Sequence, residues 1–255
     1  MQRRRVGSSG LQVSRLGLGT MTWGHDTDPD AAADQLRVFV QSGGTLVETA
    51  DGYGGGVAQD VLAGLLRRVV ARDDLVLAGR SLDGDGTQGA GAGRGALLSG
   101  LDRLLRRLGT EYLDLWQLPG WDPDVPLDET LAAAEAELIP AATHHGAGLL
   151  AWAPLGRGLL TGRFLEDAPA EVPAYVEERR TEHSTRIVQA VLTAAEGLGT
   201  SPLAVALAWV RDRPGVAAAV VGARDAAQLT ASTAAEQVVL PEAIRAALDD
   251  VSAAR

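Results

Sequence analysis

Residues 216–223 read Val-Ala-Ala-Ala-Val-Val-Gly-Ala, an apolar run of strand length without alternating polar residues. Such a run is typical of a strand buried on both faces, as the strands of parallel sheets are. Five further short apolar runs of strand length occur along the chain, at residues 16–20, 45–50, 75–79, 113–118 and 149–155. We therefore predict six parallel strands.

Longer segments of helical period lie between several of these runs. Leu36, Phe39 and Val40 share one face of a predicted helix for which Asp30 is a candidate N-cap. A second apolar stripe is formed by Leu97, Leu101, Leu104, Leu105 and Leu108. Alternating strands and helices predict an α/β fold with a parallel sheet covered by helices, and we expect residues 1–255 to form a single domain.

Composition excludes several classes of function. The chain has 33 acidic residues against 23 Arg and no Lys, a net charge of -10 that argues against binding to nucleic acid. It has no Cys, which excludes disulfides and thiolate chemistry, and without Lys no Schiff base can form. The four His show no metal-site spacing, and no apolar stretch of about 18 residues is present. We expect a soluble, cytoplasmic protein without a metal and without a membrane segment.

Five motifs follow one another in a family's order. They are GSSGLQVSRLGLGTM at 7–21, ETADGYG at 48–54, YLDLWQL at 112–118, WAPLGRGLLTG at 152–162 and VGAR at 221–224. In these motifs the chain resembles the aldo-keto reductase family. The resemblance implies a TIM-barrel-like (β/α) barrel, a nicotinamide cofactor at its C-terminal mouth, and reduction of a small-molecule aldehyde or ketone.

The resemblance also implies catalytic residues. The family's proton-donating Tyr falls on Tyr53, its Asp on Glu48, its Lys on Arg80 and its carbonyl-orienting His on Pro119. Only the Tyr is kept. We expect Tyr53, Glu48 and Arg80 to form the catalytic set, with Arg80 favouring the phenolate form of Tyr53.

Pro119 has no donor to offer a substrate carbonyl. Gln117, Trp121 or a water is the candidate replacement. Trp23, Trp116 and Trp121 sit at or beyond predicted strand ends, so we expect them to line a pocket.

The expected cofactor is NADP or NAD, bound weakly or not at all. The positions that match the family's cofactor site are Gly19, Thr20, Met21, Pro154, Leu155, Gly156, Gly158, Gly222, Arg224 and Gln228. Glycines there permit close approach of the backbone to phosphates. Asp225 stands where the family usually has Ser or Thr, and its charge would repel the 2'-phosphate of NADP, although Arg224 partly offsets this.

The chain also lacks the stretch that holds strands five and six in the family. The six predicted strands match strands one to four, seven and eight, so the barrel should be incomplete. Loss of two strands leaves residues 113–118 and 149–152 as edges. We expect either a tightened six-stranded arrangement or a homodimer across the gap, and we favour the homodimer.

Three functions remain open at this stage. The first is NAD(P)H-dependent reduction, and the second is a non-redox acid-base enzyme that uses Tyr53 with Glu48 and Arg80. The third is a catalytically degenerate small-molecule-binding or assembly protein. Against all three stands a purely structural interpretation, in which Glu48 and Arg80 form an ion pair with Tyr53 packed on them.

Overall fold

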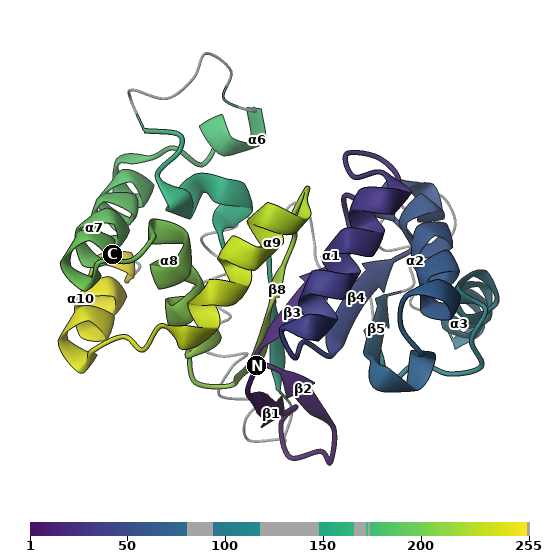
Figure 1. Ribbon diagram of the computed structural model, residues 1–255. Helices are drawn as coiled ribbons and strands as arrows, with labels where there is room; N and C mark the ends of the chain where they lie inside the picture. Colours follow the sequence, from purple (N-terminus) through teal and green to yellow (C-terminus); the bar gives the residue numbers. More distant parts are fainter. Residues whose placement is uncertain (81–93, 118–147, 166–171, 173, 254–255) are drawn as a thin grey trace.

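A curled parallel sheet of six strands forms the centre of the molecule (Figure 1). The computed structural model describes residues 1–80, 94–117, 148–165, 172 and 174–253. The strand order is β6-β5-β4-β3-β8-β7. The strands are β3 (Leu16–Gly19), β4 (Leu46–Ala50), β5 (Val76–Arg80), β6 (Leu115–Gln117), β7 (Leu149–Trp152) and β8 (Val216–Val221). All six predicted strands and the parallel sheet are confirmed.

Helices surround this sheet (Figure 1). They are α1 (Pro29–Gln41), α2 (Val57–Arg68), α3 (Arg94–Leu108), α6 (Ala174–Glu177), α7 (Glu182–Leu198), α8 (Pro202–Arg211), α9 (Ala226–Thr233) and α10 (Glu242–Ser252). Short 3-10 turns are η1 (Tyr53–Gly56), η2 (Arg72–Asp74), η4 (Gly156–Thr161) and η5 (Ala234–Gln237). In the parts of the chain described, no single helix is long and apolar enough to cross a membrane; only α7 and α8 together reach that length and hydropathy, and they meet at 105°.

Helix α1 shows how local sequence sets an element. Its N-cap is Asp28, not Asp30 as predicted, because Pro29 occupies the first helical position. The Asp28 carboxylate accepts the N–H groups of Asp30 and Ala31 at 3.0 and 2.8 Å. Leu36 of the predicted apolar face is fully buried, so α1 packs against the sheet as expected.

A two-stranded hairpin, which the strand search did not predict, lies at the N-terminal ends of the sheet strands. It consists of β1 (Arg3–Arg5) and β2 (Gln12–Ser14) in antiparallel register. Val13 of β2 is fully buried against the inner face of the sheet, together with Leu46 and Ala78. Arg4 donates to the carbonyl oxygens of Arg211 and Val216, each at 2.7 Å. The hairpin thus closes this end of the sheet.

The two edges of the sheet are β6 and β7. Among the described strands these two do not pair with each other, so the sheet is an open part of a barrel. We expected either a tightened six-stranded arrangement or a homodimer. The described strands do not close into the tightened arrangement. The two strands that the sequence analysis expects to be missing would lie between β6 and β7.

Asp212, just after α8, joins the hairpin to the helical layer. Its carboxylate accepts from Arg4 at 3.2 Å and from Arg211 at 2.9 Å, and lies 3.5 Å from Arg15. Burial raises the pKa of Asp212, but Arg211, Arg15 and Arg4 outweigh burial and bring the pKa below the ordinary 3.8. A lowered pKa means that this carboxylate stabilises the fold above about pH 4 and loses that effect as pH falls.

We therefore expect Asp212→Asn to lower the melting temperature at pH 7. The difference from wild type should shrink as pH falls below the ordinary pKa of 3.8, because the unfolded wild type then takes up a proton before the folded state does. Thermal unfolding followed by circular dichroism between pH 7 and pH 3 tests this. Asp250→Asn, at an exposed position on α10, is the matched control and should change little. A pH-independent difference would contradict the electrostatic explanation.

Candidate active site at the C-terminal mouth

The inner face of the sheet carries an apolar layer and, above it, a layer of functional side chains. Side chains two residues apart on a strand point to the same face. The lower layer contains Leu46, Ala78, Leu115 and Leu150, which belong to or pack on one apolar cluster. Two residues further along each strand stand Glu48, Arg80, Gln117 and Trp152. The strand period therefore brings these four to the inner face at the carboxyl ends of the strands.

Tyr53 lies at the centre of this layer and is 6% exposed. Its hydroxyl donates to Glu48, whose two carboxylate oxygens lie at 3.0 and 3.1 Å. It accepts from a guanidinium nitrogen of Arg80 at 3.1 Å and from the indole N–H of Trp152 at 3.0 Å. The structure thus brings the three predicted catalytic residues together, with Trp152 as a fourth partner.

These contacts use the full hydrogen-bonding capacity of the Tyr53 hydroxyl. A phenol has one proton to donate and can accept two hydrogen bonds. Glu48 takes the proton, and Arg80 and Trp152 supply the two accepted bonds. Arg80 approaches Glu48 only at 3.9 Å. The carboxylate is therefore held chiefly by Tyr53, and a substrate carbonyl can reach the hydroxyl only if one of these contacts gives way.

Burial controls the protonation of this cluster. Burial raises the pKa of Tyr53 above its ordinary value of 10.0, the Glu48 carboxylate raises it further, and Arg80 lowers it by less. Glu48 is 2% exposed, and burial raises its pKa above 4.5 against the opposing effects of Arg80 and Tyr53. Arg80 favours the phenolate, as expected, but burial and Glu48 outweigh its effect on the Tyr53 pKa. Tyr53 holds its proton, as a proton donor must.

The turn after β4 places Tyr53 at the mouth. The N–H of Asp51 donates to the Arg80 carbonyl at 3.1 Å, which continues the pairing of β4 with β5. Asp51 also accepts from Gln59 of α2 at 2.8 Å. Gly54 and Gly55 of η1 then adopt φ of 59° and 63°, a left-handed conformation that glycine tolerates best. This turn directs the Tyr53 ring back over Glu48.

Three buried polar atoms in this region have no hydrogen-bond partner within the described structure. They are Arg80 Nε, Gln117 Oε1 and Thr20 Oγ1. A buried unpaired polar atom costs about 1–3 kcal/mol, so such atoms are rare in cores and commoner where a ligand supplies the partner. Their concentration near the strand ends marks this end of the sheet as a candidate ligand site.

The three predicted cofactor segments lie at neighbouring strand ends. Residues 19–21 follow β3, residues 222–228 follow β8, and residues 154–158 follow β7, and these three strands are adjacent in the sheet. Thr22 donates to the Ala223 carbonyl at 3.0 Å, which ties the first segment to the second. The position therefore fits an extended dinucleotide that runs along this rim.

Polar groups of the segment after β8 already form hydrogen bonds with one another. Asp225 is the N-cap of α9 and accepts the Gln228 N–H at 2.8 Å, while the Gln228 side chain accepts the Arg224 N–H at 3.1 Å. A carboxylate at this helix N-terminus occupies the place where an anionic phosphate would be favoured. The residues present thus fit a dinucleotide without a 2'-phosphate better than one with it.

The loop after β7 contains two non-glycine residues with left-handed backbone. Ala153 has φ of 49° and Arg157 φ of 55°. Such conformations cost energy and are often found at functional sites. The Arg157 guanidinium lies 5.7 Å from the centre of the Trp152 ring, within reach of a cation-π contact. The loop thus holds a cation against the exposed aromatic of the mouth.

Trp152 is the site residue that the sequence did not single out. It is 45% exposed, yet its N–H reaches Tyr53 from the far edge strand of the sheet. Trp23, by contrast, is fully buried and donates to Gln35 at 2.9 Å, so the expectation that it lines a pocket is wrong. Pro119 and Trp121 lie outside the described residues.

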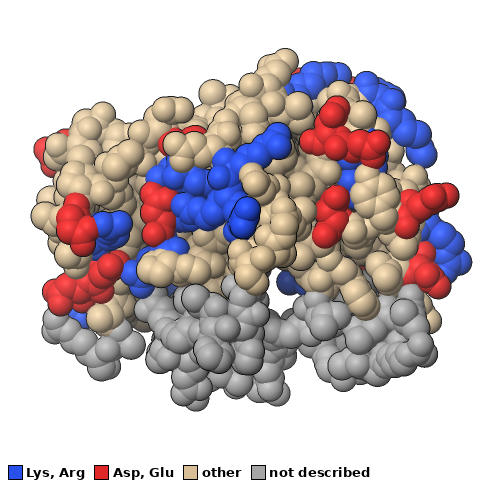
Figure 2. Space-filling view, turned by 90° about the horizontal axis from the view of Figure 1, so that it is seen from below, with Lys and Arg blue, Asp and Glu red and all other residues tan. Residues whose placement is uncertain are grey.

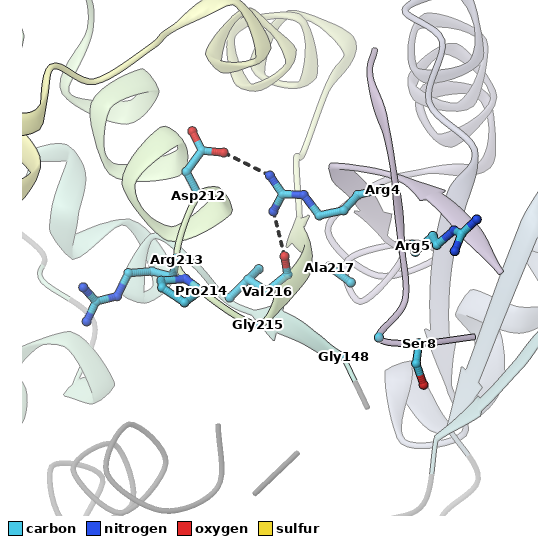
Figure 3. A pocket seen from close by; sticks show the side chains of 11 residues that line it. Arg4, Arg5, Ser8, Gly148, Asp212, Arg213, Pro214, Gly215, Val216 and Ala217 are labelled. Carbon is cyan, nitrogen blue, oxygen red and sulfur yellow. Dashed lines mark hydrogen bonds and ion pairs between the residues drawn. The ribbon is translucent and has the colours of Figure 1, made fainter. Parts of the chain in front are cut away.

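A hollow of about 500 Å³ lies at the opposite end of the strands (Figure 3). Arg4, Arg5 and Arg213 contribute to its lining, and Figure 2 shows basic side chains gathered on this face. Parallel barrels carry their chemistry at the carboxyl ends of the strands, whereas the amino ends serve stability. Arg4 is already bound to Asp212 and two carbonyls. We therefore take the Tyr53 end as the candidate active site.

Titration of Tyr53 tests the protonation argument. The tyrosinate absorbance of wild type and of Tyr53→Phe should coincide up to about pH 10, because the Tyr53 pKa lies above its ordinary value of 10.0. In Glu48→Gln the Tyr53 signal should move to lower pH than in wild type, since the neighbouring negative charge is gone. A Tyr53 contribution below pH 10 in wild type would contradict the argument.

Three curated relatives align with nearly the whole chain. It is 26% identical to "Aldo-keto reductase YhdN" of Bacillus subtilis, over 91% of this chain and 87% of that protein. It is 24% identical to "Probable voltage-gated potassium channel subunit beta" of Arabidopsis thaliana, over 94% and 92%. It is 26% identical to "L-glyceraldehyde 3-phosphate reductase" of Escherichia coli K12, over 90% and 86%.

The alignments also fit a chain shortened in its middle. The alignment with YhdN runs over 290 positions but uses 91% of these 255 residues, so about a fifth of its positions have no counterpart here. The profile of the Aldo/keto reductase family matches in two segments, residues 15–136 and 132–253. These segments include the strands that carry Glu48, Arg80 and Trp152, and the chain belongs to the Aldo/keto reductase family.

Proposed function

We propose that the chain catalyses the NAD(P)H-dependent reduction of a small-molecule aldehyde or ketone, with Tyr53 as the proton donor. One observation carries the proposal: a buried, protonated Tyr53 hydroxyl lies among Glu48, Arg80 and Trp152 at the C-terminal mouth. Family membership supports the reaction class, and two of the relatives are named as reductases. Reduction of a carbonyl needs such a donor beside the carbonyl oxygen.

Tyr53, Arg80 and Glu48 each have a role in the proposed proton transfer. A bound nicotinamide would supply a hydride to the carbonyl carbon. The Tyr53 O–H turns from Glu48 to the carbonyl oxygen, breaks as the alcohol O–H forms, and leaves a phenolate that Arg80 stabilises. Glu48, whose pKa is raised by burial and whose carboxyl lies 3.0 Å from the hydroxyl, can take up a proton from solvent and pass it to the Tyr53 phenolate. Glu48 and Arg80 are thus proposed as the pair that resets the donor.

The residues proposed to hold the cofactor are those of the three adjacent strand ends. Gly19, Thr20 and Met21 would lie beside the nicotinamide half, and Thr20 offers its unpartnered Oγ1. The turn formed by Pro154, Leu155, Gly156 and Gly158 would face the phosphates, and Gly222, Arg224 and Gln228 the adenosine half. Because Asp225 stands at this last position, NAD(H) is favoured over NADP(H).

A second candidate function is binding or assembly without reduction. The complete use of the Tyr53 hydroxyl within the protein favours it, since no capacity is left for a substrate in this arrangement. One relative bears the name of a channel subunit. A non-redox acid-base reaction that uses Tyr53, Glu48 and Arg80 would rest on the same contacts.

Assembly and location are proposals of the same kind. We propose a homodimer whose contact involves the edge strands β6 and β7, because an edge of a parallel sheet presents unpaired backbone groups. We also propose that the protein acts in the cytoplasm, where a chain without Cys has no need of disulfides.

Tyr53→Phe is the first test of the proposed reaction. The change removes the proton donor but keeps the ring, so kcat for aldehyde reduction should fall by roughly 10² or more, with little loss of stability. Consumption of the reduced nucleotide is measured by absorbance. Tyr112→Phe is the matched control, because Tyr112 is exposed and its hydroxyl donates to Asp73, away from the mouth. Full activity in Tyr53→Phe would place the chemistry elsewhere.

Cofactor preference is the second test. NADPH should bind more weakly than about 1 μM and more weakly than NADH, because Asp225 repels a 2'-phosphate. Asp225→Ser should improve NADPH binding and leave NADH binding nearly unchanged, since Ser also caps a helix. Isothermal titration calorimetry with both nucleotides measures these affinities. Tight NADPH binding by the wild type would contradict this assignment while leaving the reductase proposal intact.

A further inference from the structure

Two of the unpartnered atoms at the mouth are complementary and belong to residues on neighbouring strands. Arg80 Nε is a hydrogen-bond donor and Gln117 Oε1 is an acceptor, and neither has a partner in the described structure. The two residues are the last of β5 and β6 and are register partners across the parallel pair. A donor and an acceptor are therefore presented together, on neighbouring strands, without being used.

Both side chains face the interior of the curled sheet. Arg80 and Gln117 stand two residues beyond Ala78 and Leu115, which take part in the inner apolar cluster. Another nitrogen of the same guanidinium donates to the Tyr53 hydroxyl at 3.1 Å. Since the guanidinium is planar and rigid, its unpartnered Nε–H is fixed beside the oxygen proposed to donate the proton.

The chemistry of the two atoms selects what can bind between them. A hydroxyl group accepts from the Arg80 N–H and donates to the Gln117 oxygen, so it satisfies both. A carboxylate can only accept, and it would add a negative charge near Glu48, which is 2% exposed. A methyl group satisfies neither atom and would leave both buried and unpaired.

We propose that Arg80 and Gln117 form a hydroxyl-binding subsite, which selects carbonyl substrates with a hydroxyl on the carbon next to the carbonyl. This inference rests on the proposed reductase function and names the substrate feature that its site recognises. In such a substrate the carbonyl oxygen and the hydroxyl oxygen are on neighbouring carbons. The carbonyl oxygen can then meet the Tyr53 hydroxyl while the substrate hydroxyl meets the Nε–H of the same Arg80 guanidinium that bonds Tyr53. Gln117 is the residue that determines specificity.

A pair of substrates that differ by one hydroxyl tests the subsite. We expect wild type to reduce glycolaldehyde with a kcat/KM about tenfold or more above that for acetaldehyde, because a site built for a hydroxyl rejects the analogue that lacks it. Gln117→Leu should lose most of this preference, because its kcat/KM for glycolaldehyde falls toward its kcat/KM for acetaldehyde. Gln117→Met, which also lacks the acceptor, serves if the Leu variant does not fold.

Thr49→Val is the matched control. Thr49 is fully buried and its Oγ1 also has no partner in the described structure, but it follows Glu48 directly and so faces the outer side of β4. This variant removes an unpaired buried polar atom away from the mouth, and it should keep the glycolaldehyde preference. Neither Thr49→Val nor Gln117→Leu should lower the melting temperature much, since each removes an unsatisfied group.

The outcomes separate the subsite from the reaction. If wild type reduces both aldehydes equally well, or Gln117→Leu keeps the preference, the subsite is overturned and the reductase function stands. If wild type reduces neither aldehyde with NADH or NADPH, the proposed function fails. Saturation-transfer NMR with glycolaldehyde then decides on the subsite: contact at the hydroxymethyl protons that disappears in Gln117→Leu supports it, and any other result overturns it.

Discussion

Side chains of a β-strand alternate between its two faces, and this alternation decides where the polar groups of the mouth lie. In β4 the inner positions are Leu46 and Glu48, and in β7 they are Leu150 and Trp152. The apolar member of each pair closes the core below, and the polar or aromatic member stands above it. A shift of one residue in any strand would bury the functional side chain under the outer helices and expose a core residue instead.

The buried polar groups at the mouth lower the stability of the fold. Glu48 is almost completely buried, and burial outweighs its contacts with Arg80 and Tyr53, so its pKa is raised and its charged form is less favourable than that of an exposed Glu. Unpaired atoms of Arg80 and Gln117 add to the cost. Proteins tolerate such groups where a ligand or a reaction uses them, and stability is commonly lost at functional sites for this reason.

The opposite end of the sheet uses charge in another way. Arg211 is buried, yet it is paired with Asp212 and donates to the carbonyls of Ala235 and Val238. Arg15 is paired with Glu236 at 2.9 Å. Arg4, Arg15 and Arg211 thus each have an anion or a carbonyl as a partner, and these contacts hold the hairpin at the amino ends of the strands.

The sequence alone determined the strands, the parallel sheet and the three residues Glu48, Tyr53 and Arg80. These follow from local information, because buried strands have apolar runs and a motif keeps its spacing. The N-cap of α1 was misplaced by two residues, since Asp28 and Asp30 both have a suitable side chain and only the position of Pro29 distinguishes them.

Only the tertiary structure decided what surrounds Tyr53. Trp152 lies 99 residues away, on a strand that the sheet order separates from β4 by two others, so only the curl of the sheet brings its N–H to the hydroxyl. The upward shift of the Tyr53 pKa depends chiefly on burial, which no spacing in the sequence reveals. Local patterns specify elements and their faces, whereas distances across a curved sheet arise only when all the strands pack together.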